Sequence, residues 1–121
     1  MISRNLFSLS GRKILVTGAA GHVGRALCEY LVSDGAIVFA VDSDRSGLDA
    51  LSSDLDPSGE ALVVFLSDLS DQQQRVRLKS EVAAVTTSLD GAVFAAAFVG
   101  TSDLEGWNVD FARQSVDTWR Q

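Results

Sequence analysis

The sequence predicts an α/β fold built on a doubly wound parallel sheet with the strand order 3-2-1-4. Four short apolar runs are separated by segments with helical periodicity, which gives the order βαβαβαβα. The runs are continuously apolar rather than alternating, as is typical of parallel strands covered by helices on both faces. Right-handed crossovers between such strands place the first strand between the second and the fourth.

The first strand and the first helix occupy residues 13 to 35. Lys13–Thr17 is a short apolar run rich in β-branched residues, and it stops at Gly18. The helix that follows ends at Asp34, with Gly35 as its C-terminal cap. Its apolar residues recur at helical spacing, so we expect one buried face made of Val23, Ala26, Leu27, Tyr30 and Leu31. This face places the single tyrosine in the core.

Two further buried strands are expected at Ala36–Val41, which is closed by Asp42, and at Ala61–Leu66. The helix between them is short and amphipathic, with an apolar face formed by Leu48, Leu51 and Leu55.

The third helix is expected to begin at a capping box, in which Ser70 and Gln73 satisfy each other's backbone N–H groups. Its apolar face comprises Leu78, Val82, Val85 and Leu89. Gly91–Ala96 is the fourth strand. A last helix is expected to start with Val109, Ala112, Val116 and Trp119. Because the sequence stops inside that helix, we expect a fold truncated after the fourth strand and the following helix.

Length and composition predict a single domain spanning residues 1–121, with one hydrophobic core. The net charge is −6 and no Lys/Arg cluster occurs, which argues against nucleic acid and membrane surfaces as partners. One cysteine and one histidine provide neither a disulfide nor a structural metal site. No apolar run approaches the roughly 20 residues of a membrane span. We therefore expect a cytoplasmic protein without metal.

A glycine-rich turn joins the first strand to the first helix. Gly18 permits a tight turn, Gly21 has no Cβ to obstruct a pyrophosphate, and Gly24 allows close helix–sheet packing. The free N–H groups at the helix start favour the phosphate anion. The expected cofactor-binding residues of this segment are Gly18, Ala20, Gly21, His22, Val23 and Gly24. The alternatives are a turn that binds nothing and, for the histidine, an exposed loop residue.

Asp42 ends the second strand, where an acidic residue binds the ribose hydroxyls of a dinucleotide. A 2′-phosphate at ~4 Å would meet a like charge, at a cost of about 4 kcal/mol for an effective dielectric constant of ~20. We therefore expect NAD to be preferred over NADP. Two alternatives remain open: Asp42 caps the next helix, a role for which Asp44 competes, and Arg45 accepts a 2′-phosphate.

The ends of the third and fourth strands complete the expected site. Asp68 is placed to accept a hydrogen bond from the adenine amino group, and Leu69 to pack on the ring. A role for Asp68 in capping the next helix together with Ser70 is the alternative. Small residues at Ala95, Ala96 and Ala97 would let a cofactor lie close over the sheet edge, although helix–sheet packing explains them equally well.

These residues carry a resemblance to a known family. The glycine spacing, Asp42 and the pair Asp68–Leu69 resemble the Rossmann-like, N-terminal cofactor-binding part of a short-chain dehydrogenase/reductase (SDR). Residues 9–18 resemble the family's entry to the first strand, and residues 117–119 its tryptophan-bearing helix start. Ala95–Ala97 departs from the Asn-rich turn usual in the family. The resemblance covers essentially the whole chain.

The resemblance implies an NAD-dependent oxidoreductase that transfers a hydride between nicotinamide and a carbonyl or alcohol. In the family a Tyr, with a Lys four residues later, acts as acid or base, and a Ser orients the reacting oxygen. This chain has neither: its one tyrosine, Tyr30, is followed four positions on by Asp34. We therefore expect the 121 residues to bind a dinucleotide without turning over a substrate, and to contain no catalytic residue.

Two other functions remain open. The glycine spacing is that of the extended branch of the family, so a fragment of a nucleotide-sugar epimerase or dehydratase is one alternative. A non-catalytic dinucleotide-binding module is the other. In addition, an uncovered fourth strand would leave an apolar parallel edge, which predicts self-association, aggregation or a rearranged edge.

Overall fold

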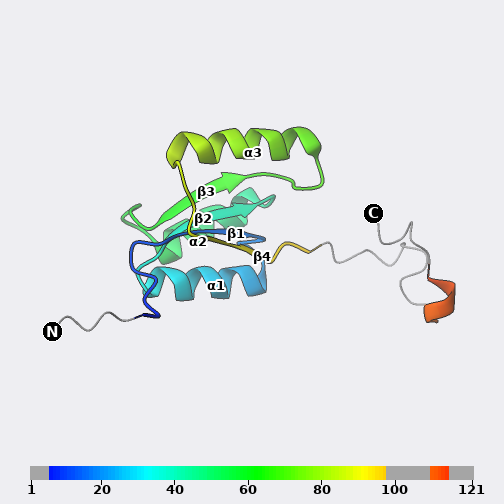
Figure 1. Cartoon of the computed structure of the whole chain (residues 1–121), viewed down its shortest axis with the longest axis horizontal. Coiled ribbons are helices and arrows are strands. Elements are labelled where there is room, and N and C mark those ends of the chain that lie inside the picture. Colours follow the sequence, from blue (N-terminus) through cyan, green and yellow to red (C-terminus); the bar gives the residue numbers. More distant parts are fainter. Residues whose placement is uncertain (1–5, 98–109, 115–121) are drawn as a thin grey trace.

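A computed structural model describes residues 6–97 and 110–114 of the chain. Its strands are all parallel and lie in the order β3-β2-β1-β4, as the sequence predicted (Figure 1). The elements in chain order are β1 (Lys13–Thr17), α1 (His22–Ser33), β2 (Ile37–Asp42), α2 (Arg45–Leu55), β3 (Leu62–Leu66), α3 (Gln72–Val85), β4 (Gly91–Phe94) and a short 3-10 helix (Phe111–Arg113).

Helices cover both faces of the sheet. Successive side chains of a strand point to opposite faces, so a continuously apolar strand needs cover on both. Helices α1 and α2 pack on one face and α3 on the other (Figure 1). The first face buries Val16, Val38, Ala40, Cys28, Leu48 and Leu51 completely. On the second face Phe39 and Phe65 stack with their ring centroids 6.0 Å apart, beside Leu78 and Val82 of α3.

The buried face of α1 differs from the predicted one. Gly24, Cys28 and Leu31 face the sheet, whereas Val23 and Tyr30 are 66% and 64% exposed. The assignment of Tyr30 to the core is therefore wrong. The reason is that Gly24 packs closely on the glycine turn. This contact, rather than the spacing of apolar residues, fixes which side of the helix faces the sheet.

The start and end of α3 also differ from prediction. Asp71, not Ser70, is the N-cap, and its carboxylate accepts hydrogen bonds from the backbone N–H groups of Gln73 and Gln74. The helix ends at Val85, so Leu89 lies beyond its face. The cap therefore lies one residue after the predicted one, and the Asp71 carboxylate takes the place of the expected capping box.

The outer edge of β4 is uncovered in the described part of the chain. The strand ends at Phe94 rather than at Ala96, and the Phe94 side chain is 78% exposed.

The ion pair between Arg25 and Asp54 joins α1 to α2, so the exposed Val23 and Tyr30 lie on the flank of α1 that faces away from α2. The predicted last helix lies mostly outside the described residues. None of the helices that the structure describes is long and apolar enough to cross a membrane.

Candidate functional site

The glycine turn is held between the sheet and α1 by contacts that only glycine permits. Gly18 has a φ of +67°, and a Cβ there would lie 2.7 Å from the backbone of Ala96. A Cβ on Gly24 would lie 1.9 Å from the carbonyl oxygen of Gly18. The start of α1 and the exit of β4 are therefore both packed directly against the turn.

Gly21 meets a different requirement. Its φ is −74°, and a Cβ there would approach only the carbonyl oxygen of Gly18, at 3.3 Å. It is the N-cap of α1, and it supplies no side-chain cap. Within the described residues the N–H groups of His22 and Val23 donate to no acceptor, as expected for the first turn of an uncapped helix. These donors and the absent Cβ leave this helix start open to a ligand.

Asp42 ties the glycine turn to the end of β2. Its Oδ2 accepts a hydrogen bond from the backbone N–H of Ala20 at 3.0 Å, and its Oδ1 accepts one from the N–H of Asp44 at 3.0 Å. Asp44 caps α2 by accepting a hydrogen bond from the N–H of Gly47, and this bond, with a second from the Ser46 hydroxyl, lowers the pKa of Asp44. The capping role is thus taken by Asp44.

Asp68 presents one carboxylate oxygen to the loop and keeps the other available. Its Oδ1 accepts hydrogen bonds from the hydroxyl of Ser70 at 2.7 Å and from its N–H at 2.9 Å, and these bonds hold the pKa of Asp68 below its usual value. Within the described residues, Oδ2 of Asp68 accepts no hydrogen bond and the N–H of Leu69 donates none. Two consecutive residues after β3 therefore retain an unused acceptor, on Asp68, and an unused donor, on Leu69.

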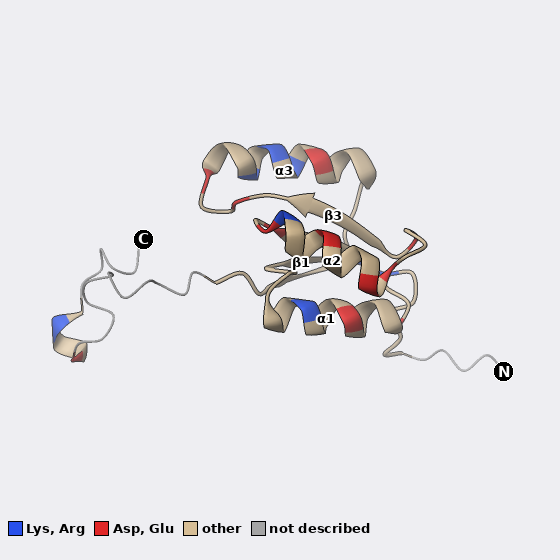
Figure 2. Cartoon of the chain, turned by 180° about the vertical axis from the view of Figure 1, so that it is seen from behind, with Lys and Arg blue, Asp and Glu red and all other residues tan. Residues whose placement is uncertain are grey.

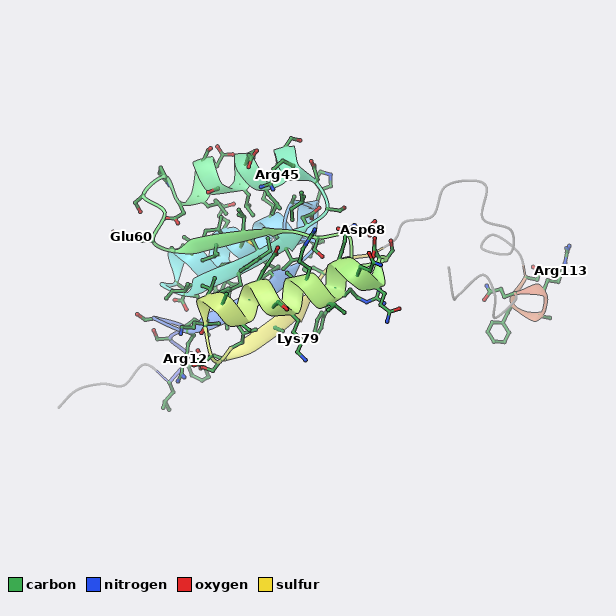
Figure 3. The ribbon with its side chains drawn as sticks, turned by 90° about the horizontal axis from the view of Figure 1, so that it is seen from above. Arg12, Arg45, Glu60, Asp68, Lys79 and Arg113 are labelled. Carbon is green, nitrogen blue, oxygen red and sulfur yellow. The ribbon has the colours of Figure 1, made fainter. Side chains whose placement is uncertain are left out.

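An open groove of about 770 Å³ lies along the carboxyl ends of the strands. This is the edge at which ligands bind in open α/β sheets, and the volume lies in the range of small-molecule sites. Figure 3 shows Asp68 beyond the end of β3 and Arg45 at the start of α2. The groove is lined by Thr17, Gly18, Gly21, Val41, Asp42, Ser43, Ser67, Asp68, Leu69, Ser70, Phe94, Ala95, Ala96 and Ala97.

Eight of the twelve residues expected from the sequence line this groove, namely Gly18, Gly21, Asp42, Asp68, Leu69, Ala95, Ala96 and Ala97. The other four do not. Gly24 packs beneath the turn, Ala20 contributes its N–H to Asp42, and His22 and Val23 are exposed at the start of α1.

The small polar residues of the groove were not predicted from the sequence. Ser43 and Ser67 each directly follow a strand, and Ser67 is 2% exposed. Their position directly after a strand could have identified them, because the carboxyl ends of parallel strands meet at one edge of a sheet. Phe94 was predicted only as part of a strand, yet it lines the groove.

The groove is acidic at two of its strand ends. Figure 2 shows acidic positions in the loop after β3 and in the loop before α2, both at the carboxyl edge of the sheet. Asp42 and Asp68 line the groove, and Asp44 lies beside it. The basic side chain of Arg45 is exposed at the start of α2. An additional phosphate near Asp42 would therefore approach two carboxylates and one guanidinium.

The strand order and the glycine turn at the carboxyl edge define a Rossmann-like α/β domain. A family model described as short chain dehydrogenase matches residues 12–121. The chain belongs to this family of oxidoreductases.

Two curated relatives illustrate the match. The chain is 40% identical over 73 residues to 2,3-dihydroxy-2,3-dihydro-p-cumate dehydrogenase of Pseudomonas putida, an alignment that covers 60% of this chain and 28% of that protein. It is 32% identical over 111 residues to 2,5-dichloro-2,5-cyclohexadiene-1,4-diol dehydrogenase of Sphingobium indicum, covering 90% of this chain and 43% of the relative. The chain thus spans less than half the length of these relatives.

Solved structures share the fold. A short-chain dehydrogenase/reductase described as glucose/ribitol dehydrogenase, from Brucella melitensis, superposes with a TM-score of 0.70 at 28% identity, covering 94% of this chain and 45% of that one. The 3-ketoacyl-(acyl-carrier-protein) reductase of the same organism, complexed with NADH, superposes with a TM-score of 0.63 at 24% identity, covering 70% of this chain and 34% of that one. At that identity the second likeness concerns the fold alone.

Proposed function

We propose that this chain is the NAD-binding part of a short-chain oxidoreductase that exchanges a hydride between nicotinamide and a carbonyl or alcohol. The observation that carries the proposal is the uncapped start of α1, which opens beside Gly21 at the edge of the groove. Bound NAD would supply the hydride acceptor. The 121 residues form one dinucleotide-binding domain in this proposal.

The glycine turn is assigned to the pyrophosphate. The N–H groups of His22 and Val23 have no acceptor among the described residues, and a helix N-terminus carries partial positive charge. The missing Cβ of Gly21 lets an anion approach these donors. By contrast, α2 and α3 begin with the carboxylate caps Asp44 and Asp71, which already satisfy such donors.

The adenosine half is assigned to the ends of β2 and β3. Each carboxylate oxygen of Asp42 accepts one backbone hydrogen bond and retains a second acceptor site for a ribose hydroxyl. The free Oδ2 of Asp68 and the N–H of Leu69 suit the edge of the adenine ring. The carboxylates of Asp42 and Asp44 disfavour a 2′-phosphate, which supports NAD over NADP.

No catalytic residue is assigned within the 121 residues. Tyr30 lies on the exposed flank of α1 and is followed four positions on by Asp34 rather than by a lysine. The two curated relatives are both dehydrogenases, which supports hydride transfer over the epimerase alternative. We also propose a reducing, cytoplasmic setting, because the one cysteine, Cys28, cannot form an internal disulfide.

Titration of the purified chain with NADH and then NADPH tests this function. We expect NADH to bind, and NADPH to bind more weakly by a factor of up to about ten. The factor is limited because solvent reduces the repulsion between Asp42 and a 2′-phosphate. Isothermal titration calorimetry measures both affinities, and the melting temperature should rise with each ligand in the same order. Stronger binding of NADPH would overturn the assignment of Asp42 and point to Arg45.

We further propose that two copies of the chain associate through the uncovered edge of β4. Light scattering should detect concentration-dependent association. Replacing the exposed Ala92 by lysine should weaken it, because a charge on an edge strand opposes strand pairing. Ala50→Lys is the matched control, since Ala50 is exposed on α2, away from the edge. Equal association of both variants would exclude β4 as the interface.

A further inference from the structure

The loop between β3 and α3 is held in place by side chains that lie outside the groove. Oε1 of Gln74 accepts a hydrogen bond from the backbone N–H of Asp68 at 2.8 Å. Nη1 of Arg75 donates a hydrogen bond to the carbonyl oxygen of Leu69 at 2.7 Å. The two residues that the proposed function assigns to adenine are thus each fixed by one side chain of α3.

The orientation of the Gln74 amide is itself determined. Its Nε2 donates a hydrogen bond to Oδ2 of Asp71 at 3.3 Å, and the other oxygen of Asp71 accepts the N–H groups that begin α3. Only this orientation directs Oε1 at a donor and Nε2 at an acceptor. Gln74 therefore links the cap of α3 to the loop that precedes it.

Asp68 and Leu69, two neighbouring residues of this loop, line the groove, and each retains one unused hydrogen-bonding group. Oδ2 of Asp68 is an acceptor and the N–H of Leu69 is a donor, and neither is used by another described residue. Adenine offers the complementary pattern, an amino donor beside a ring-nitrogen acceptor. Hypoxanthine, in which a carbonyl replaces the amino group, offers the reverse pattern and would leave both protein groups unpaired or opposed.

We infer that Gln74 and Arg75 are positioning residues for base selection: by fixing the backbone at Asp68 and Leu69, they make the site select adenine over hypoxanthine. The inference rests on the proposed dinucleotide-binding function. Gln74 and Arg75 themselves touch no ligand in this account. They set the direction of the neighbouring donor and acceptor, on which discrimination between the two bases depends.

Calorimetric affinities for NAD and for its hypoxanthine analogue test the inference on the full chain. We expect the wild type to prefer NAD by about tenfold or more. Gln74→Leu should reduce this preference to about threefold or less, because the N–H of Asp68 loses its acceptor. Gln74→Glu, which retains that acceptor, should restore part of the preference. Gln73→Leu is the matched control, since Gln73 is exposed and bonds to Asp71 through its backbone N–H, which the substitution keeps.

Arg75→Met provides an independent variant, because it removes the hydrogen bond to the carbonyl oxygen of Leu69 and leaves Gln74 in place. It decides the question if circular dichroism finds Gln74→Leu unfolded. An unchanged preference in Arg75→Met and in folded Gln74→Leu would overturn the inference, as would a wild type that binds NAD and its analogue equally well. Those two results leave NAD binding itself intact. A wild type that binds neither dinucleotide would instead overturn the proposed function, and the inference with it.

Discussion

Replacing Gly24 by alanine is expected to destabilise the chain severely and to abolish dinucleotide binding. The new Cβ would lie 1.9 Å from the carbonyl oxygen of Gly18 and 2.9 Å from Cα of Ala19. Both contacts are backbone atoms, so no side-chain rotation relieves the overlap, and the helix must move off the turn. We expect a loss of about 3 kcal/mol or more in the free energy of unfolding. Urea denaturation and the melting temperature, which should fall by roughly 10–20 °C, measure it.

Gly21→Ala is the matched control, with the same substitution three residues earlier. Its Cβ would approach only the carbonyl oxygen of Gly18, at 3.3 Å, and its φ of −74° suits any residue. We expect a nearly unchanged melting temperature and a weakened affinity for NADH, since the methyl group occupies the approach to the N–H groups of α1. Similar melting temperatures for Gly24→Ala and the wild type would contradict the packing argument.

The strands were predictable from the sequence because a buried parallel strand appears as a short run of apolar residues. Lys13–Thr17 was predicted with the bounds that the structure has, since a parallel strand covered on both faces is apolar throughout. The rotation of α1 was missed because Gly24 faces the sheet, and glycine has no hydrophobicity to signal a buried position. Helical periodicity therefore selected Val23, which is about 100° away on the helix.

The candidate site was predictable to the extent that it consists of strand ends. Asp42 is the last residue of β2, Asp68 and Ala95 follow β3 and β4, and the topology brings these strand ends to one edge. The supporting contacts were not predictable. Gln74 lies in a run of three glutamines, and nothing in the sequence distinguishes the one whose amide meets the N–H of Asp68. Side chain-to-backbone hydrogen bonds across a loop leave no periodic pattern.

Asp42→Asn is expected to lower the affinity for NADH by about tenfold to a hundredfold, as expected for the loss of charge-assisted hydrogen bonds. The carboxylate of Asp42 accepts one backbone N–H with each oxygen, from Ala20 and from Asp44. An asparagine has one acceptor oxygen, so in either orientation its NH₂ group faces a backbone donor. Either the glycine turn then loses its hydrogen bond to Asp42, or the loop between β2 and α2 loses its own. The ribose loses an anionic acceptor as well.

The ratio of NADH to NADPH affinity separates these two roles of Asp42. If the carboxylate contacts the ribose, removing its charge also removes the repulsion of a 2′-phosphate, and the ratio should fall in Asp42→Asn. If Asp42 serves only to hold the turn, both affinities should fall together and the ratio should stay constant. Asp49→Asn, an equal change of charge at an exposed position of α2, should alter neither affinity. A constant ratio in Asp42→Asn would therefore restrict Asp42 to positioning the pyrophosphate site and remove the support it gives to NAD over NADP.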